Sequence, residues 1–276
     1  MKLLRKNFFP GLHGILALGF LYISVLSSHG QTSIGLAPGM VVQEFQPGQP
    51  LEVEFSISNG TATPMEMRGS VNNWWYNESN EKIFDPPSNS PQSAANWIEV
   101  VPRVFTVPPK SYARFKIIIT PPSNASPGGH YAAVFVESKP ELTKPATAEH
   151  KAVFTNVRLG ALVLLTTANT AKYDIVLDNP VLIPPTHSHN LKVDVLLENK
   201  SNTHIFPQAQ LAVLNEDNEV VAKAQGETKR FLPQQKDHLS VTWDGSLPPG
   251  NYNAILTLIY GDGKVRTQDF KFKVPS

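Results

Sequence analysis

Short segments of alternating apolar and polar residues follow one another along most of the chain, separated by Pro, Gly and Asn. Leu51–Asn59 and Leu191–Asn199 show the alternation most clearly. Alternation of period two puts one row of side chains on a buried face and the other row in solvent, as in a half-buried β-strand. After residue 30 no amphipathic helix of more than two turns is found. The pattern therefore predicts an all-β fold.

The same order of strands occurs twice. Each unit starts with an alternating strand that ends in Asn, continues with a Phe-containing strand, and closes with Pro-Gly before a strand that opens with Tyr. The paired positions are Asn59 and Asn199, Phe105 and Phe231, and Tyr131 and Tyr252. An ordered set of matches indicates a duplicated module.

Strands of this length and spacing are typical of immunoglobulin-like folds. We therefore predict two tandem immunoglobulin-like antiparallel β-sandwiches, at residues 31–168 and 172–276. The chain of 276 residues is long enough for two such domains. In each unit the tyrosine ring is expected to join the core while its hydroxyl fixes a loop. The Asn-x-Ser/Thr positions, among them Asn59, Asn124 and Asn199, are expected to lie in exposed turns.

The N-terminus has the pattern of an export signal at residues 1–30. Three cations within the first six residues precede an uncharged apolar run at 15–26, and small residues flank position 29. The run is shorter than the roughly 20 apolar residues that a membrane span needs. We expect an exported chain with no membrane span in its mature part.

The cysteine content and the net charge indicate the cellular compartment and the class of partner. The chain has no cysteine, although small exported eukaryotic domains of this class usually carry disulfides, so a bacterial periplasm or cell surface is favoured. The formal net charge is +1 and only 17% of residues are charged, which argues against nucleic acid as a partner.

No catalytic motif is evident. Serines do not fall in nucleophile motifs, no cysteine nucleophile exists, and the acidic residues are scattered. His187 and His189 are two residues apart, so on a strand both would lie on the same face and could supply two ligands of a metal site. The only candidate for a third ligand is His204. We predict that the protein is not an enzyme, and we expect no cofactor and no metal.

An apolar strand at residues 153–165 is the first candidate binding surface. If this strand lies at a sheet edge, its backbone could pair with an extended partner segment while one apolar face fills the partner's groove. The alternative is an interior strand whose apolar face belongs to its own core. The candidate partner-binding side chains are Val153, Val157, Leu159, Ala161, Val163 and Leu165.

Trp74, Trp75 and Tyr76 form an aromatic triplet at the end of the predicted strand Met65–Tyr76. An Asn-, Ser- and Pro-rich insertion at 77–96 follows, and the second unit has no counterpart of similar length. Strand neighbours point to opposite faces, so the three rings do not all enter the core. The triplet supplies candidate exposed anchors for a sugar or a protein partner. The alternative is one buried Trp and one Trp covered by the insertion.

Residues 97–108, with a strand, Pro102 and a second strand, resemble the strand–Pro–strand signature of PapD-like periplasmic chaperones. The turn at Asn59 and the long strand at 151–165 resemble two further elements of the same family. The resemblance implies a chaperone that binds an extended segment of a pilus subunit by β-strand addition. It also implies a cleft Arg–Lys pair that grips the subunit's C-terminal carboxylate. Here residues 33–38 contain no cation, and only Arg158 and Lys172 lie near the domain junction.

Residues 121–134, which read Pro-Pro-Ser-Asn-Ala-Ser-Pro-Gly-Gly-His-Tyr-Ala-Ala-Val, are similar to the first domain of WxL-interacting surface proteins. That family implies a surface module that binds cell-wall material or a partner protein. Two predictions follow. The first is a non-enzymatic chaperone or assembly factor for another envelope, pilus or surface protein. The alternative is a cell-surface structural or adhesion module that binds cell-wall polysaccharide or a surface protein.

Overall fold

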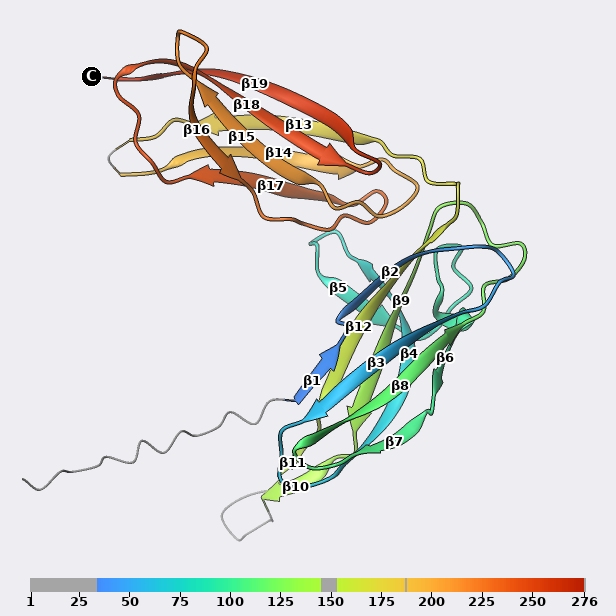
Figure 1. Cartoon of the computed structure of the whole chain (residues 1–276). Helices are drawn as coiled ribbons and strands as arrows, with labels where there is room; N and C mark the ends of the chain where they lie inside the picture. The colour runs from blue at the N-terminus through green and yellow to red at the C-terminus, as the bar shows by residue number, and fades with distance from the viewer. Residues whose placement is uncertain (1–33, 145–152, 187, 276) are drawn as a thin grey trace, which may run out of the picture. The chain divides into compact units, whose positions relative to one another are not determined.

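The computed structural model describes residues 34–144, 153–186 and 188–275, with backbone alone for 141–144 and 153–154 (Figure 1). The predicted signal peptide and His187 lie outside the described residues. The predicted all-β fold of two tandem sandwiches is confirmed: within these ranges there is no α-helix, only a short 3-10 turn, η1 (Ala95–Trp97). The described part of the chain contains no helix long and apolar enough to cross a membrane.

Twelve strands lie before residue 168. They are β1 (Ile34–Ala37), β2 (Met40–Phe45), β3 (Leu51–Asn59), β4 (Met65–Tyr76), β5 (Lys82–Asp85), β6 (Ile98–Val101), β7 (Val104–Val107), β8 (Ser111–Ile119), β9 (Gly129–Ser138), β10 (Glu141–Lys144), β11 (Val153–Thr155) and β12 (Arg158–Thr167). One sheet has the order β1-β3-β8-β6, and the facing sheet has the order β2-β12-β9-β4-β5 with β7 beside β4. Strands β10 and β11 form a separate two-stranded ribbon.

The first strand of this sandwich changes sheets. β1 pairs antiparallel with β3, and after Pro38 and Gly39 the chain continues as β2, which pairs parallel with β12 in the other sheet. Pro38 has no amide hydrogen to donate, which suits a break between two ladders. This parallel pair is an exception to the predicted antiparallel arrangement. The break also decides where β2 begins, and β2 meets β12 only from Leu162 onward.

Seven strands belong to the second half. They are β13 (Ile175–Ile183), β14 (Leu191–Asn199), β15 (Gln208–Leu214), β16 (Val220–Gln225), β17 (Lys236–Trp243), β18 (Gly250–Tyr260) and β19 (Lys264–Val274). They form sheets of order β13-β14-β17 and β16-β15-β18-β19. The domain bounds 31–168 and 172–276 themselves stay predictions.

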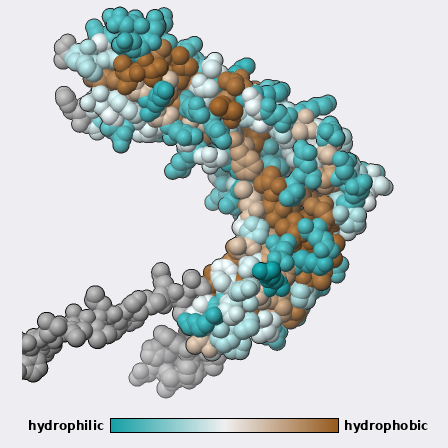
Figure 2. Space-filling model, viewed as in Figure 1, coloured by the Kyte–Doolittle hydropathy of each residue, from teal (hydrophilic) through white to brown (hydrophobic). Residues whose placement is uncertain are grey.

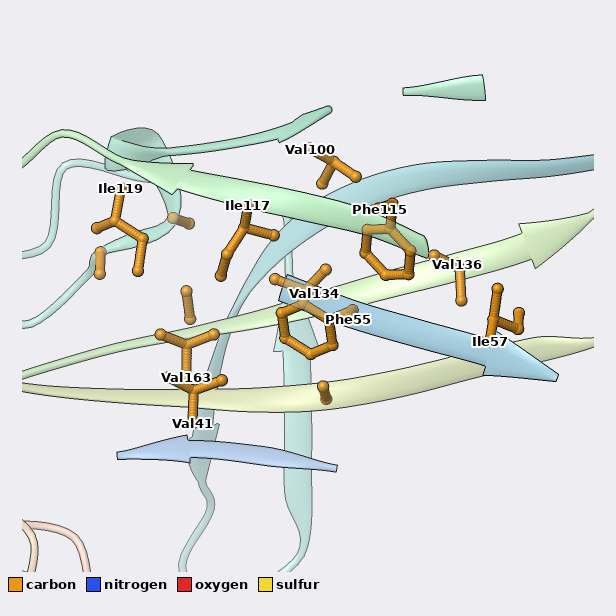
Figure 3. Close-up of a cluster of buried hydrophobic side chains, with 14 of the residues drawn as sticks. Val41, Phe55, Ile57, Val100, Phe115, Ile117, Ile119, Val134, Val136 and Val163 are labelled. Atoms are coloured by element: carbon orange, nitrogen blue, oxygen red, sulfur yellow. The ribbon is translucent and has the colours of Figure 1, made fainter. Parts of the chain in front are cut away.

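Each sandwich has its own apolar core. In the first, Phe55 and Ile117 from one sheet face Val134 and Val163 from the other, all at 1% exposure or less (Figure 3). The second core is built around Leu197, Leu211, Phe231 and Leu256 and shares no residue with the first. Burial of this apolar surface, at about 25 cal/mol per Å², is the main source of stability. Two separate cores are what a duplicated module requires.

The expectation that Asn59 and Asn199 lie in exposed turns is wrong. Asn59 is 1% exposed and donates from Nδ2 to the carbonyl oxygens of Thr63 and Val107, while its Oδ1 accepts from the Thr61 amide. Asn199 is fully buried and bonds in the same way. A tight turn leaves backbone groups unpaired, and a buried Asn satisfies them.

Candidate functional site

Strand β12 is covered unevenly along one side. Its residues 158–166 pair with β9, but β2 pairs only with residues 162–167. The neighbouring β1 bonds to β3 instead. Among the described residues, 158–161 of β12 therefore have no ladder partner on the β2 side. The predicted single strand at 153–165 is also interrupted at Asn156 and Val157, where β11 ends before β12 begins.

The predicted binding residues divide into two groups along this strand. Ala161, Val163 and Leu165 are fully buried in the core of their own sandwich, where Figure 3 shows Val163 beside Val41. For these three, the structure supports the alternative of an interior strand. Their side chains are unavailable to a partner because β2 and the facing sheet already cover them.

The other group lies at the uncovered end. Val157 and Leu159 are half-buried at the margin of the core. Val157 is held in place by Ser138, whose amide donates to its carbonyl oxygen at 2.8 Å and whose hydroxyl accepts from its amide at 2.9 Å. The side chain of Val153 lies outside the described ones. Binding by Val157 and Leu159 stays a prediction.

β2 is the outer strand next to β12, and it has apolar side chains that are exposed to solvent. Met40 and Val42 are 38% and 46% exposed, while Val41 between them is buried. On β12, half-buried Leu162 is the ladder neighbour of Met40. In the view of Figure 1, Figure 2 shows apolar surface interspersed with polar surface over both sandwiches. The sequence of β2 alternates in a way that predicts one buried and one outward face, but only the structure shows that β2 is an outer strand of its sheet.

Arg230 is the cation next to this edge, and sequence reasoning missed it. Its Nη1 lies 3.3 Å from Met40 Sδ, and its Nη2 donates to Tyr76 Oη at 2.8 Å. The guanidinium stacks over Trp74 at 4.9 Å from the ring centroid. It is half-buried, its Nε is buried without a partner, and no described carboxylate pairs with it. A half-buried cation without a counterion favours an anionic ligand.

Neighbouring titratable groups respond to this environment. Burial, with a smaller effect from the Arg230 charge, lowers the pKa of His204 to about 4. Burial raises the pKa of the Tyr131 hydroxyl above its usual value. Both groups are therefore neutral at physiological pH, so neither adds to or offsets the charge of Arg230. Its own neighbour in the chain, Lys229, is paired with Asp237.

The two junction cations that the sequence offered lie elsewhere. Arg158 is exposed, stacks over Phe135 at 4.0 Å from the ring centroid and lies 3.9 Å from Glu137. Lys172 is exposed, and its amide donates to Asn202 Oδ1. Only a long-range contact between two repeats places Arg230 at the edge, so no local pattern could have identified it.

The aromatic triplet splits as strand geometry requires. Trp74 is 3% exposed and packs with Tyr131, Leu164 and Leu232, which together form a small apolar cluster outside both cores. Trp75 is 47% exposed, and Tyr76 is half-buried. Trp75 is therefore the exposed anchor candidate of the three.

Reactive side chains do not form a catalytic arrangement in the described ranges. Asp194, His238 and Ser240 meet on β14 and β17, but His238 Nδ1 and Ser240 Oγ both bond to the Asp194 carboxylate, each at 2.5 Å. A relay needs His between the other two groups. In the part of the chain that the structure describes, no cluster of three or more His, Cys, Asp or Glu side chains could hold a metal.

Comparison with known proteins finds similarity in structure alone. No protein-family model and no curated protein matches the sequence. A chain of the chaperone–tip adhesin complex of CFA/I fimbriae is 10% identical to this chain, with a TM-score of 0.45. The match covers 100% of that chain and 89% of this one. The Escherichia coli chaperone DraB is 14% identical, with 96% of it and 87% of this chain covered and a TM-score of 0.43.

A chain of the Salmonella enterica SafA pilin–SafB chaperone complex is 12% identical, with 97% of it and 88% of this chain covered and a TM-score of 0.43. The solved structures that resemble this chain thus include fimbrial chaperones, in agreement with the resemblance of its motifs. The TM-scores of these three structures are below 0.5, so the likeness describes the fold and says nothing about the site of this chain.

Proposed function

We propose that the protein is a non-enzymatic assembly factor that binds an extended segment of another envelope, pilus or surface protein by β-strand addition. The observation that carries the proposal is the bare stretch at 158–161 of β12, beside the half-buried Val157 and Leu159. An added strand gains main-chain hydrogen bonds from such an edge, and its side chains bury the neighbouring apolar surface.

The outer strand β19 of the second sandwich is better protected against pairing. β19 ends the second sandwich and corresponds in order to β12, but it carries Lys264, Arg266, Lys271 and Lys273. Charged side chains on an outer strand discourage association. The uncovered end of β12 carries a single cation, Arg158, which is stacked on Phe135. The contrast supports a working edge in the first sandwich.

Arg230 gives the edge a polar end. It touches Met40, and Met40 pairs with Leu162, the first residue of β12 that β2 covers. A partner strand on 158–161 would therefore run toward the guanidinium. We assign Arg230 to a carboxylate of the bound segment, because Arg binds carboxylates through paired N–H groups.

The class of partner follows from the motif resemblance to PapD-like chaperones. The predicted export signal places the encounter in a bacterial periplasm or at the cell surface. The alternative of a wall-binding surface module stays a prediction.

The test is replacement of Leu159 by Asp, in the full chain purified from its native envelope. The charge should abolish co-purification of the partner protein, because a carboxylate would be buried against an apolar strand. Val265→Asp on β19, at a side chain that is 57% exposed, is the matched control and should leave the partner bound. Unchanged co-purification with Leu159→Asp, in a variant that unfolds like the wild type, would remove this edge from the mechanism.

A further inference from the structure

A groove of about 750 Å³ lies beside the aromatic triplet and is lined by no residue of β12, although it adjoins Trp74 and Tyr76, which contact Arg230. One wall is formed by the end of β4, by β5 and by the insertion that follows, and the other by residues 232–236. The insertion is the part of the first module that the second module lacks, and strand addition at β12 makes no use of it. Long insertions of this kind in compact domains are often functional.

Trp75 supplies a flat apolar surface in this groove. Its side chain is 47% exposed, and its Nε1 donates to Asp85 Oδ2 at 2.7 Å. This bond fixes the plane of the indole while leaving ring surface accessible. An exposed ring held by a dedicated partner is suited to stacking on a ligand.

Hydrogen bonds tie the insertion to the end of β4 and to residue 236. Asn73 donates to the Pro86 carbonyl and to Ser88 Oγ, and it accepts from Ser93 Oγ. On the other side, Asn80 donates to the Lys236 carbonyl at 2.8 Å. A wall that is ordered before binding loses little entropy when a ligand arrives.

Other polar groups of the groove remain free to bond. Gln92 and Gln234 are exposed, and within the described residues no hydrogen bond engages either side-chain amide. The same holds for the hydroxyl of Ser90. Trp74, at 3% exposure, also lines the groove, and its Nε1 has no partner. Amides and hydroxyls both donate and accept, so the lining suits a ligand rich in hydroxyl or amide groups.

From these features we infer that the groove binds an uncharged oligosaccharide. The apolar face of a pyranose ring stacks on Trp75, and its hydroxyls bond to Gln92, Gln234 and Ser90. The lining carries little net charge: Lys236 offsets one of the two carboxylates, Glu78 and Asp85, and the Asp85 carboxylate accepts from Trp75. A phosphate or polyanion finds no basic cluster there. An extended peptide takes most of its hydrogen bonds from a strand edge, whereas this groove offers side-chain groups.

Titration calorimetry of the full chain with three neutral tetrasaccharides tests this inference. The probes are the tetramer of N-acetylglucosamine, cellotetraose and maltotetraose, each up to about 10 mM, which covers weak single-site affinities. At least one should bind, and Trp75→Ala should weaken it about tenfold, as expected for loss of a stacked ring. Trp75→Phe should retain part of the affinity, and Gln92→Ala should cost about threefold.

Tyr112→Ala is the matched control, because Tyr112 is an exposed aromatic residue, at 59%, on the other sheet. It should leave the affinity unchanged. Leu159→Asp should also leave it unchanged, which separates this site from strand addition. The inference is overturned if none of the three probes binds the wild type. It is equally overturned if Trp75→Ala binds as well as the wild type, or if a Ser/Asn-rich peptide binds at Trp75 and the sugars do not.

Discussion

The two sandwiches have the same buried-Asn turn inside them and differ in their edge strands. Both close the turn after their first long strand with a buried Asn that makes the same three bonds to the backbone. Their last strands, β12 and β19, are different. β19 is a charged outer strand, whereas β12 is an apolar strand that β2 covers over only part of its length. The duplicated parts stabilise each copy, and the parts that differ are where we place binding.

The paired tyrosines show the same division. Tyr252 donates to the Pro248 carbonyl at 2.8 Å and packs against the second core, as the sequence predicted. Tyr131 is buried as well, but it packs with Trp74 and Leu232 in the cluster outside the two cores. The two tyrosines occupy equivalent positions in the repeat, but their side chains pack against different sets of residues.

Replacing either buried Asn should give the largest loss of stability, because it removes the turn structure that the two sandwiches share. Asn59→Ala removes four hydrogen bonds and Asn199→Ala removes three, and both leave buried carbonyls unpaired. Each should therefore lower the free energy of unfolding by about 3 to 4 kcal/mol. Asn124→Ala, at an exposed Asn-x-Ser position, should change it by less than about 0.5 kcal/mol. Urea denaturation measures all three. A small effect at Asn199 alone would show that the copies are not stabilised alike.

The two ends of β12 should also respond unequally. Leu165→Ala should cost about 3 kcal/mol of unfolding free energy, because it leaves a cavity in a fully buried site. Leu159→Ala should cost about 1 kcal/mol, because that side chain is half-buried. Thermal and urea unfolding compare the pair. Equal losses would mean that the uncovered end is as fully packed as the core.

The neutral state of His204 makes stability depend on pH. The folded pKa is about 4 and the ordinary value is 6.5, so the unfolded chain binds a proton more readily between these values. The contribution of His204 is complete above pH 6.5 and is lost as the pH falls toward 4, by up to about 3 kcal/mol. His204→Phe should remove that part of the pH dependence. Identical pH profiles of the wild type and this variant would contradict it.

Arg230→Gln should have the smallest effect on folding and a clear effect on binding. The variant keeps a polar group near Tyr76 but loses the stacked cation over Trp74, so unfolding should change by about 1 kcal/mol or less. Partner affinity should fall about tenfold or more through loss of the charge-assisted bonds. Unchanged affinity, measured by surface plasmon resonance, would remove the carboxylate from the account.

Local patterns predicted much of this fold and little of its site. The alternation at Leu51–Asn59 and its repeat at Leu191–Asn199 indicated the strands and the two modules, since period-two patterns report burial directly. The buried role of Asn59 was missed because Asn is mostly exposed in folded proteins, and a turn sequence does not show whether its amide is buried. The break before Arg158 and the placement of Arg230 depend on pairing partners far along the chain, which composition and periodicity do not encode.

Hydrogen–deuterium exchange of the chain alone and with its co-purified partner tests the central claim most directly. Strand addition predicts that the partner slows exchange within residues 158–161, where the β2 side of β12 has no ladder partner among the described residues. Amides in Lys264–Val274 of β19 should be unchanged. Protection that appears at β19 and not within 158–161 would contradict the account.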